Sequence, residues 1–115
     1  MSEQAIKETE DKLSYVDLPY KAIQSMSKVF GDSKKSGKYP RDNHFKPIEN
    51  TLLLDSIQRH LIALMNGEDI DSSGNSHYAH IMSNAAMLEE ARINNTLIEN
   101  RISRPKQIRN ENELN

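Results

Sequence analysis

The chain has 115 residues, of which 36% are hydrophobic and 28% are charged, and its formal net charge is -2. This length predicts one domain with a modest core, because small domains bury a smaller share of their unfolded surface than large ones. The near-neutral charge excludes the strong basic field that is typical of proteins bound to duplex nucleic acid. The absence of cysteine excludes disulfides and thiolate metal sites.

The first twelve residues, MSEQAIKETEDK, are polar and charged, and we predict a flexible N-terminus over residues 1–12. They lack the apolar segment of a signal peptide. No apolar run in the sequence approaches the ~20 residues of a membrane span. We therefore expect a cytoplasmic protein with no membrane partner, and the lack of cysteine agrees with this expectation.

The first predicted helix covers residues 17–30, DLPYKAIQSMSKVF. Asp17 can cap its N-terminus, Pro19 suits its first turn, and Gly31 can end it. Helical spacing places the main apolar side chains of this segment on one face. They are Ala22, Ile23, Met26, Val29 and Phe30.

Residues 31–47 are predicted to form a long basic loop, because glycines and prolines interrupt any regular pattern. Long loops in compact domains are usually functional or disordered. The cations suit phosphate and the interleaved rings suit stacking on a base, although a solvated lysine loop has the same composition. The cations are Lys34, Lys35, Lys38, Arg41 and Lys46, and the rings are Tyr39, His44 and Phe45.

The second predicted helix runs from Asn50–Thr51 to about Asn66, and Gly67 follows it as a terminating glycine. Its buried stripe is predicted to consist of Leu53, Ile57, Leu61, Leu64 and Met65. Further apolar residues widen this stripe beyond what a simple surface helix needs. They are Leu52, Leu54 and Ile62. Such a helix is typical of a protein centre or a subunit interface, so we predict a homo-oligomer, either a dimer or a tetramer.

The third predicted helix begins at Asn75 or Ser76 and ends near Arg101, with a break predicted as an option at Asn94–Asn95. Its apolar face is predicted to include Ile81, Ala85, Leu88 and Arg92, with Ile98 and Ile102 along the same edge. The polar segment 103–115 is predicted to be a flexible tail. No segment alternates with the period of a strand, so we predict the all-α fold class, a small helical bundle with one domain over residues 13–102.

The stretch 67–80 reads GEDIDSSGNSHYAH and contains three closely spaced carboxylates. Glu68, Asp69 and Asp71 could bind a hard cation such as Mg²⁺, but their spacing does not match an EF-hand. A solvated acidic loop explains the same residues, and so does capping of the next helix by Asp71 or a serine. The sequence leaves these alternatives open.

Two histidines, His77 and His80, are three residues apart and share a helix face, which Asn84 extends. Zinc-binding pairs on helices prefer a spacing of four, so no structural zinc is expected. The imidazoles can instead bind phosphate or base edges, or pair with Glu68 and Asp71. The first turn of the helix also favours an anion near His77.

Arg59 and His60 precede this stretch on the second helix. Arg59 either complements the helix dipole or binds a phosphate. The short turn after this helix would bring Arg59, His77 and His80 around one phosphate, together with the first amides of the third helix. The long loop would then close over the ligand. Lys38 and Arg41 are predicted to close over the phosphate, and either Tyr39 or Phe45 is predicted to lie against a base.

Several blocks of the sequence together resemble one known family. They are KYPRDNHF (38–45), RHLIALMNGEDID (59–71), Gly74, HYAH (77–80) and NAAML (84–88), preceded by Asp11–Leu13. Their order and length are similar to those of a phage-associated family of small helical domains described as the dATP/dGTP diphosphohydrolase N-terminal domain. The resemblance implies an all-α nucleotide-handling protein of phage type. The chain departs from the family at His44–Phe45, where members usually carry a tryptophan after the asparagine.

The same resemblance implies less about catalysis. Longer proteins join this domain to a MazG-type pyrophosphohydrolase unit, which holds Mg²⁺ through an E-E-x-x-E block and a downstream E-x-x-D. In this chain Glu89–Glu90 is followed by ARINN and later by Glu99, so neither block is complete. A protein that only binds its ligand is therefore at least as well supported by the sequence as an enzyme.

Three functions are consistent with these residues. The first is sequestration of a nucleotide immune signal, such as a cyclic dinucleotide, without hydrolysis or a cofactor, as some small helical oligomers of phages do. The second is a Mg²⁺-dependent dATP/dGTP diphosphohydrolase that releases pyrophosphate, and the third is a non-catalytic accessory module. The predicted ligand-binding residues are Lys38, Tyr39, Arg41, Asn43, Phe45, Arg59, His60, Glu68, Asp71, His77, His80 and Asn84. For an enzyme, the predicted metal ligands are Glu68, Asp69 and Asp71, and the predicted catalytic residues are Glu68, Asp71, His77 and His80.

Overall fold

The computed structural model describes residues 3–8 and 10–102, so the predicted tail over 103–115 lies outside the described residues. The chain is mostly helical, which confirms the all-α class. Its elements are, in order, α1 (Tyr20–Lys35), the 3-10 helix η1 (Asn43–Phe45), β1 (Ile48–Glu49), α2 (Asn50–Met65), α3 (His77–Asn94) and β2 (Leu97–Ile98). Within the described part, no helix combines the length and hydropathy of a membrane span.

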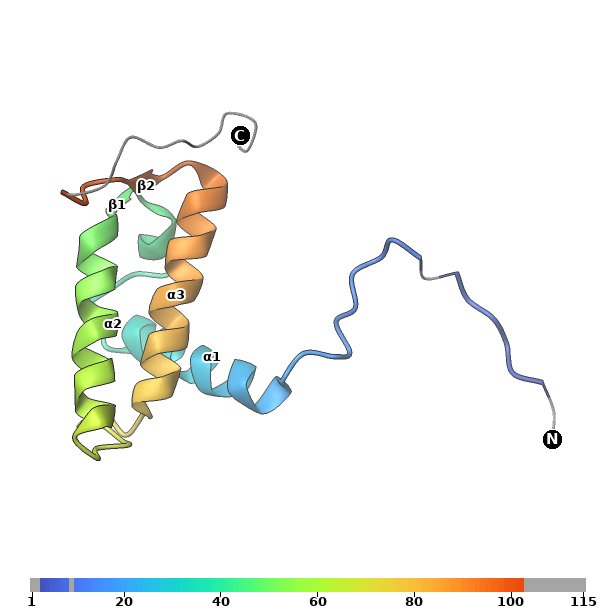
Figure 1. The fold of residues 1–115 in the computed structure, drawn as a ribbon, viewed down its shortest axis with the longest axis horizontal. Coiled ribbons are helices and arrows are strands. Elements are labelled where there is room, and N and C mark those ends of the chain that lie inside the picture. Colours follow the sequence, from blue (N-terminus) through green and yellow to red (C-terminus); the bar gives the residue numbers. More distant parts are fainter. Residues whose placement is uncertain (1–2, 9, 103–115) are drawn as a thin grey trace.

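Helices α2 and α3 form an antiparallel hairpin, and α1 packs against α3 near the turn that joins them (Figure 1). The opposite end of the hairpin is held by β1 and β2, which pair in parallel with Ile48 beside Leu97. This two-stranded pair was not predicted, because strands of two residues carry no periodic pattern in the sequence. The hairpin therefore has a turn end and a strand end.

Helix α1 differs from its prediction at both ends. Its N-cap residue is Pro19, which makes no side-chain cap, while Asp17 accepts a hydrogen bond from Ser14 at 2.6 Å. The helix also continues through Gly31 to Lys35. A glycine inside a helix costs about 1 kcal/mol, and the contacts of Asp32 one residue later offset that cost.

The predicted ends of α2 are confirmed. The helix covers Asn50–Met65, and Gly67 follows with a left-handed φ of 90°. The N–H of Gly67 donates to the carbonyl of Leu64, and the N–H of Glu68 donates to the carbonyl of Ala63, both at 2.9 Å. These two bonds form a Schellman motif, which satisfies the last carbonyls of the helix.

Helix α3 begins where predicted, since the side chain of Ser76 accepts a hydrogen bond from the N–H of Ala79 at 3.0 Å. The predicted end near Arg101 is wrong. Asn95 adopts a left-handed φ of 60°, and the N–H of Thr96 donates to the carbonyl of Ala91 at 2.9 Å. The helix ends at Asn94, because this second Schellman motif turns the chain into β2.

The interior of the described part is small and unusually polar. Its buried hydrophobic residues are Leu53, Ala79 and Ala91, whereas its buried polar residues are Asn50, Asn75, His77, Ser83 and Asn84. Asn84 donates to the hydroxyl of Ser56 across the hairpin at 2.9 Å. Polar contacts therefore take a share of the helix packing that apolar side chains usually provide.

The predicted apolar stripe of α2 is only partly buried. Leu53 is buried and Ile57 and Leu64 are half-buried, but Leu61 is 40% exposed and Met65 is 85% exposed. The prediction for these last two residues is wrong because α3 meets α2 through the face that carries Ser56 and His60. Hydrophobic spacing alone does not detect a polar contact face.

The predicted apolar face of α3 is wrong for the same reason. Ala85 and Arg92 are exposed, while Ile81 and Leu88 are only half-buried. The edge residues Ile98 and Ile102 are 46% and 94% exposed. The buried row is instead His77, Asn84 and Ala91, which repeats every seven residues and so keeps one side of the helix against α2.

Asn75 connects α1 to the turn end of the hairpin. Its amide donates to Asp32 at 2.9 Å and to the hydroxyl of Ser73 at 3.1 Å, and its carbonyl oxygen accepts from Lys28 at 3.1 Å. The hydrogen bond from Asn75, together with Lys28, holds the pKa of the Asp32 carboxyl below its usual range. The side chain of Asn75 thus forms hydrogen bonds to both α1 and the turn.

Asn75→Ala is expected to lower the free energy of unfolding by about 1–3 kcal/mol, because it leaves buried polar partners unsatisfied. Asn94→Ala is the matched control, since Asn94 is exposed and its side chain makes one long hydrogen bond of 3.5 Å. Urea denaturation followed by circular dichroism measures both changes. Equal stabilities for the two variants would contradict the role assigned to Asn75.

Candidate functional site

Three histidine rings meet at the turn end of the hairpin. His60 comes from the last turns of α2, and His77 and His80 come from the first turn of α3. The ring of His60 lies 5.0 Å from that of His77 and 4.5 Å from that of His80, with the latter pair stacked within 2° of parallel. The antiparallel hairpin brings these rings together, because the end of one helix lies beside the start of the next.

Two carboxylates from the turn hold the histidines of α3. Glu68 Oε1 lies 3.1 Å from His77 Nε2, and Asp71 Oδ2 lies 2.8 Å from His80 Nε2. These pairings were one of the alternatives predicted from the sequence, and the structure contains both. The carboxylates therefore fix the orientation and the tautomers of the two rings.

The turn places Asp71 through its own backbone geometry. The N–H of Gly74 donates to the carbonyl of Asp71 at 3.0 Å, and the N–H of Ser73 donates to the Asp71 side chain at 2.9 Å. Burial alone would raise the pKa of the Asp71 carboxyl, but the hydrogen bonds from Ser73 and the nearby His80 hold it below its usual range. Asp71 is thus ionised at neutral pH and accepts the proton of His80 Nε2.

The hydrogen bonds define a relay from Glu68 through His77 to His60. In the tautomer of His77 that carries its proton on Nε2, the Glu68 carboxylate accepts this proton and the Nδ1 atom of the ring is an acceptor. His60 Nδ1 lies 2.7 Å from it and must therefore carry the donated proton. His60 Nε2 then holds a free lone pair, and no described residue makes a hydrogen bond to it.

The environment of His60 favours this neutral form. Burial lowers the pKa of the His60 imidazole most, followed by the charges of His80 and His77, and Arg59 also lowers it. Asp71 acts in the opposite direction. The site therefore presents a half-buried, neutral imidazole, and the exposed side chain of Arg59 precedes it on α2.

Two predicted ligand-binding residues lie inside the hairpin. The side chain of His77 is only 6% exposed, and Asn84 is buried against Ser56. Both side chains are largely buried in this structure, and His77 contacts Glu68 and His60 there. That both histidines of α3 face a ligand stays a prediction.

The first amides of α3 do not form the expected anion site. The N–H of His77 donates to the carbonyl of Asp69 at 2.9 Å, and the N–H of Ala79 donates to the Ser76 side chain at 3.0 Å. These two amides are already satisfied inside the chain, so the guanidinium of Arg59 remains as the donor for a phosphate at this end of the hairpin.

The end of the basic loop that forms η1 lies away from the histidines. Figure 1 places η1, which contains Asn43 and Phe45, beside the strand end of the hairpin and away from the histidines. Lys38 lies 5.4 Å above the ring of Tyr39, which is a cation–π distance, and Arg41 is exposed. Phe45, one of the two rings predicted to lie against a base, is therefore distant from the histidines in this structure.

The carboxylates of the turn are arranged around histidines and not around a common point for a cation. Within residues 3–8 and 10–102, no group of three or more His, Asp or Glu side chains is arranged to hold a metal ion. Glu68 is engaged with His77, and Asp71 is engaged with His80 and Ser73. The predicted set of Glu68, Asp69 and Asp71 thus does not fit a Mg²⁺ site held by this part of the chain.

Ser73 and Asn75 belong to the site but were not predicted. Ser73 contacts both Asp71 and His80, and Asn75 binds Ser73 and α1. The order Asp-Ser-Ser-Gly is typical of a turn in which the aspartate side chain accepts from the backbone two residues later. That signal could have predicted the Ser73 contact, but not the contact between Asn75 and α1.

The lowered pKa of His60 predicts a loss of stability in acid. The unfolded chain binds a proton at about 6.5, the ordinary value for histidine, whereas the folded chain binds it only at lower pH. The stabilisation is therefore complete above about 6.5 and is lost as the pH falls through the lower folded pKa. Denaturant unfolding at several pH values should show this loss. His60→Asn, which keeps a donor near the Nδ1 position, should flatten the dependence, and an unchanged pH profile in that variant would contradict the assignment.

Comparison with known proteins supplies one match. A family model described as dATP/dGTP diphosphohydrolase, N-terminal, matches residues 2–101. No curated protein and no solved structure matches the chain. The matched range contains the three histidines and both carboxylates that hold them, and it agrees with the resemblance read from the sequence blocks. The chain therefore belongs to the dATP/dGTP diphosphohydrolase N-terminal family.

Proposed function

We propose that this chain binds a purine deoxynucleoside triphosphate at the turn end of the hairpin and takes part in the hydrolysis that releases pyrophosphate. The observation that carries the proposal is the relay from Glu68 through His77 to His60, whose Nε2 has no hydrogen-bond partner among the described residues. The family match supports the substrate class, since dATP and dGTP appear in the family's description. The relay supports a reaction that needs a base.

Arg59 is the group proposed to bind the phosphates. It is exposed, and no hydrogen bond or ion pair joins its side chain to another described residue. A guanidinium can donate two parallel hydrogen bonds to a phosphate. Glu68 and Asp71, whose charges would repel a triphosphate, are instead turned towards imidazoles. This arrangement supports a phosphate position next to the ring of His60.

His60 is proposed to act as the base. A water molecule bound at Nε2 would form a new bond to the phosphorus atom from which pyrophosphate departs, and the bond to the bridging oxygen would break. The proton of the water would move to His60 Nε2. The resulting positive charge would be stabilised through His77 by the carboxylate of Glu68, as in other carboxylate–imidazole pairs.

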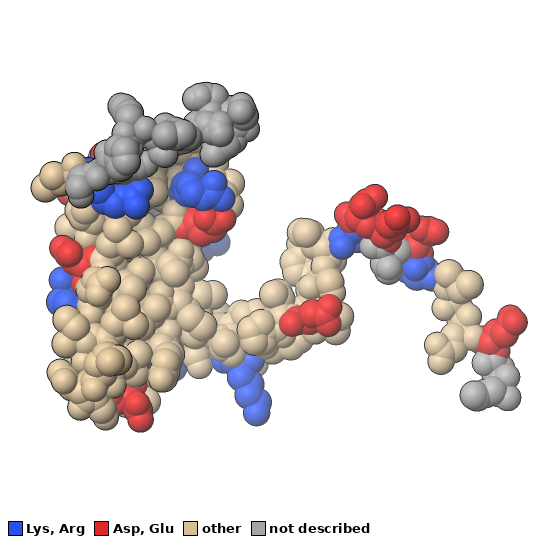
Figure 2. All heavy atoms as spheres, viewed as in Figure 1, with Lys and Arg blue, Asp and Glu red and all other residues tan. Residues whose placement is uncertain are grey.

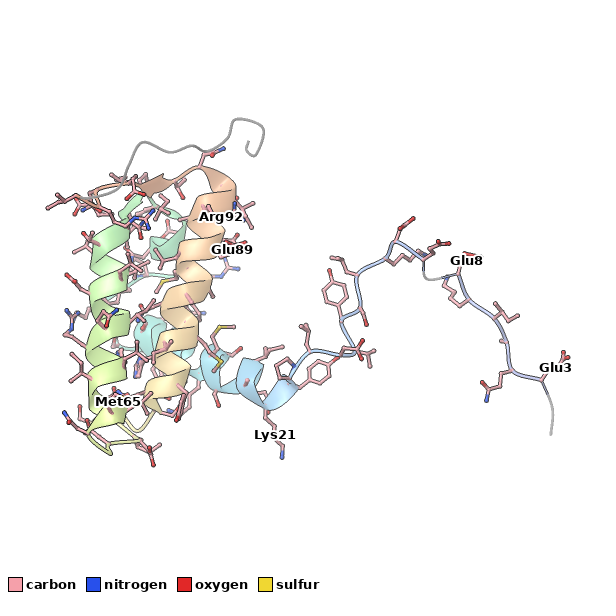
Figure 3. The ribbon with its side chains drawn as sticks, viewed as in Figure 1. Glu3, Glu8, Lys21, Met65, Glu89 and Arg92 are labelled. Carbon is pink, nitrogen blue, oxygen red and sulfur yellow. The ribbon has the colours of Figure 1, made fainter. Side chains whose placement is uncertain are left out.

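No step is assigned to Mg²⁺, because the described residues do not form a site for it. The acidic pair Glu89–Glu90 does not supply one either, since Glu89 Oε1 lies 2.7 Å from Arg92 Nε on the outside of α3 (Figure 3). Sequestration of a cyclic nucleotide was the first expectation from the sequence, and neither the family match nor the site geometry supports it. The assay below separates that outcome from hydrolysis.

The proposal is tested by incubating the protein with dATP, dGTP and cyclic dinucleotides, with and without Mg²⁺, and identifying the released nucleotides after denaturation. Deoxynucleoside monophosphate and pyrophosphate are expected. Recovery of intact cyclic dinucleotide from a tight complex would replace the proposal with sequestration. The absence of any binding would leave only the accessory role.

Arg59→Ala is expected to weaken triphosphate binding about ten- to a hundredfold, which corresponds to roughly 1.5–3 kcal/mol for a lost charge-assisted contact. The melting temperature should change little, because an exposed arginine contributes modestly to folding. Arg101→Ala is the control, since Arg101 lies at the strand end and pairs with Glu99. Calorimetric titration of both variants measures the effect, and equal affinities would contradict the proposed phosphate contact.

Glu68→Gln is expected to reduce turnover by about ten- to a hundredfold, because the relay loses the charge that stabilises protonated His60. Asp69→Asn makes the same chemical change one residue later, at an exposed side chain outside the relay. The pH dependence of kcat should change only in Glu68→Gln. If both variants retained the wild-type profile, Glu68 would have no part in proton transfer.

A further inference from the structure

One face of α2 points away from α3 and is apolar and largely exposed, with only its member Leu54 half-buried. We define the outer face of α2 as Leu54, Leu61, Ile62 and Met65, which lie on one side of the helix by their spacing. Ile62 is 58% exposed and Met65 is 85% exposed, and Met65 lies at the turn end of α2 (Figure 3). Figure 2 shows a broad area without charged side chains over this half of α2. No described element covers the exposed members of this face.

A second exposed apolar segment precedes α1. We define the arm as residues 13–18, of which Leu13 is 77%, Tyr15 is 65% and Val16 is 76% exposed. Local hydrogen bonds shape this segment even though its apolar side chains remain exposed. The N–H of Leu18 donates to the carbonyl of Tyr15 at 3.2 Å, and the hydroxyl of Tyr20 donates to the same carbonyl at 2.7 Å. The arm thus presents apolar groups on a short, hydrogen-bonded turn.

The arm does not approach the outer face of its own α2. Helix α1 packs on α3, and its N-terminal end points away from α2, so the arm leaves the body on the remote side of α3 (Figure 1). To reach α2 within one molecule, the arm would have to pass around α3. The outer face of α2 in a second copy can contact the arm directly.

We propose that the arm of one copy packs on the outer face of α2 of a second copy, and that the exchange is reciprocal about a two-fold axis. A two-fold dimer uses each arm and each face once, so neither apolar surface stays exposed. This proposal goes beyond the nucleotide site and does not depend on it. It also gives a specific form to the homo-oligomer expected from the sequence.

The available area agrees with a stable dimer. The arm has four apolar side chains, since Leu18 is also 43% exposed, and the outer face has four. At roughly 100 Å² each, these eight side chains would remove about 800 Å² from water in each contact. The two-fold axis repeats this contact, which gives about 1,600 Å² in total, the usual size of a specific interface. The small apolar interior of the single chain makes this additional burial a substantial part of its stability.

Because the chain has no cysteine, introduced cysteines can test the contact between copies directly. Val16→Cys protein is mixed with Ile62→Cys protein and oxidised mildly. A disulfide-linked dimer is expected from the mixture and not from either variant alone. A mixture of Ile6→Cys and Ile93→Cys proteins is the control, since these side chains are exposed but lie outside the arm and the outer face. Failure of the first mixture to link above the level of the control mixture would overturn the proposal.

The mass in solution provides the second readout. Light scattering should give a dimer for the wild type and a monomer for Ile62→Asp, with unchanged helix content. Ile93→Asp is the matched control, because Ile93 is 60% exposed and Ile62 is 58% exposed, and it should remain a dimer. A wild-type monomer, a dimeric Ile62→Asp protein, or a disulfide formed within one chain of the Val16→Cys, Ile62→Cys double variant would each overturn the proposal. Nucleotide binding by Ile62→Asp, measured separately, does not bear on this result.

Discussion

The hydrogen bond between His60 and His77 is the contact on which the rest of the structure depends. It joins α2 to α3 at 2.7 Å in a hairpin whose described interior contains few apolar side chains. A bond between two imidazoles forms only when one ring donates and the other accepts. The Glu68 carboxylate determines which ring donates, because it accepts the proton of His77 Nε2 and leaves His77 Nδ1 as the acceptor for His60. A single carboxylate on the turn thus determines the tautomers of both histidines at the helix contact.

This arrangement makes packing and chemistry interdependent. In most helical hairpins apolar side chains hold the helices and a few polar groups are added for function. Here the groups suited to proton transfer also hold the helices together, along with Ser56 and Asn84. A change that alters the protonation of the cluster therefore also alters the helix contact, and stability and activity are expected to vary together with pH.

Local signals in the sequence predicted the parts of the fold that local chemistry controls. Gly67 and Ser76 mark real helix ends, since a left-handed glycine and a serine cap act within a few residues. The continuation of α1 through Gly31 could not be predicted, because it depends on Asn75, which is distant in sequence. The sequence predicted the end of α3 at Asn94–Asn95 only as an alternative to a longer helix, because asparagine adopts the left-handed conformation in some contexts and not in others.

The candidate site was predicted in composition but not in connectivity. The pairing of Glu68 with His77 and of Asp71 with His80 follows from short-range spacing and was among the alternatives. The contact of His60 with both rings depends on the register of the two helices. The spacing of apolar residues predicted the wrong contact face of α2, so this register could not be predicted. The position of Phe45 depends on the pairing of β1 with β2, for which the sequence has no signal.

The turn that carries the carboxylates is shaped by the handedness of its backbone and not by crowding. Gly67 and Gly74 have φ angles of 90° and 87°, and a Cβ atom built on either would meet nothing within 4 Å. The obstacle to an L-residue at these positions is therefore torsional strain alone. A D-alanine, whose mirror-image preference matches these angles, would avoid this torsional strain and would restrict the unfolded chain. The positions of Glu68 and Asp71 thus depend on two backbone positions with left-handed φ angles. Chemical synthesis of the chain with a D-residue at either position would retain that backbone conformation.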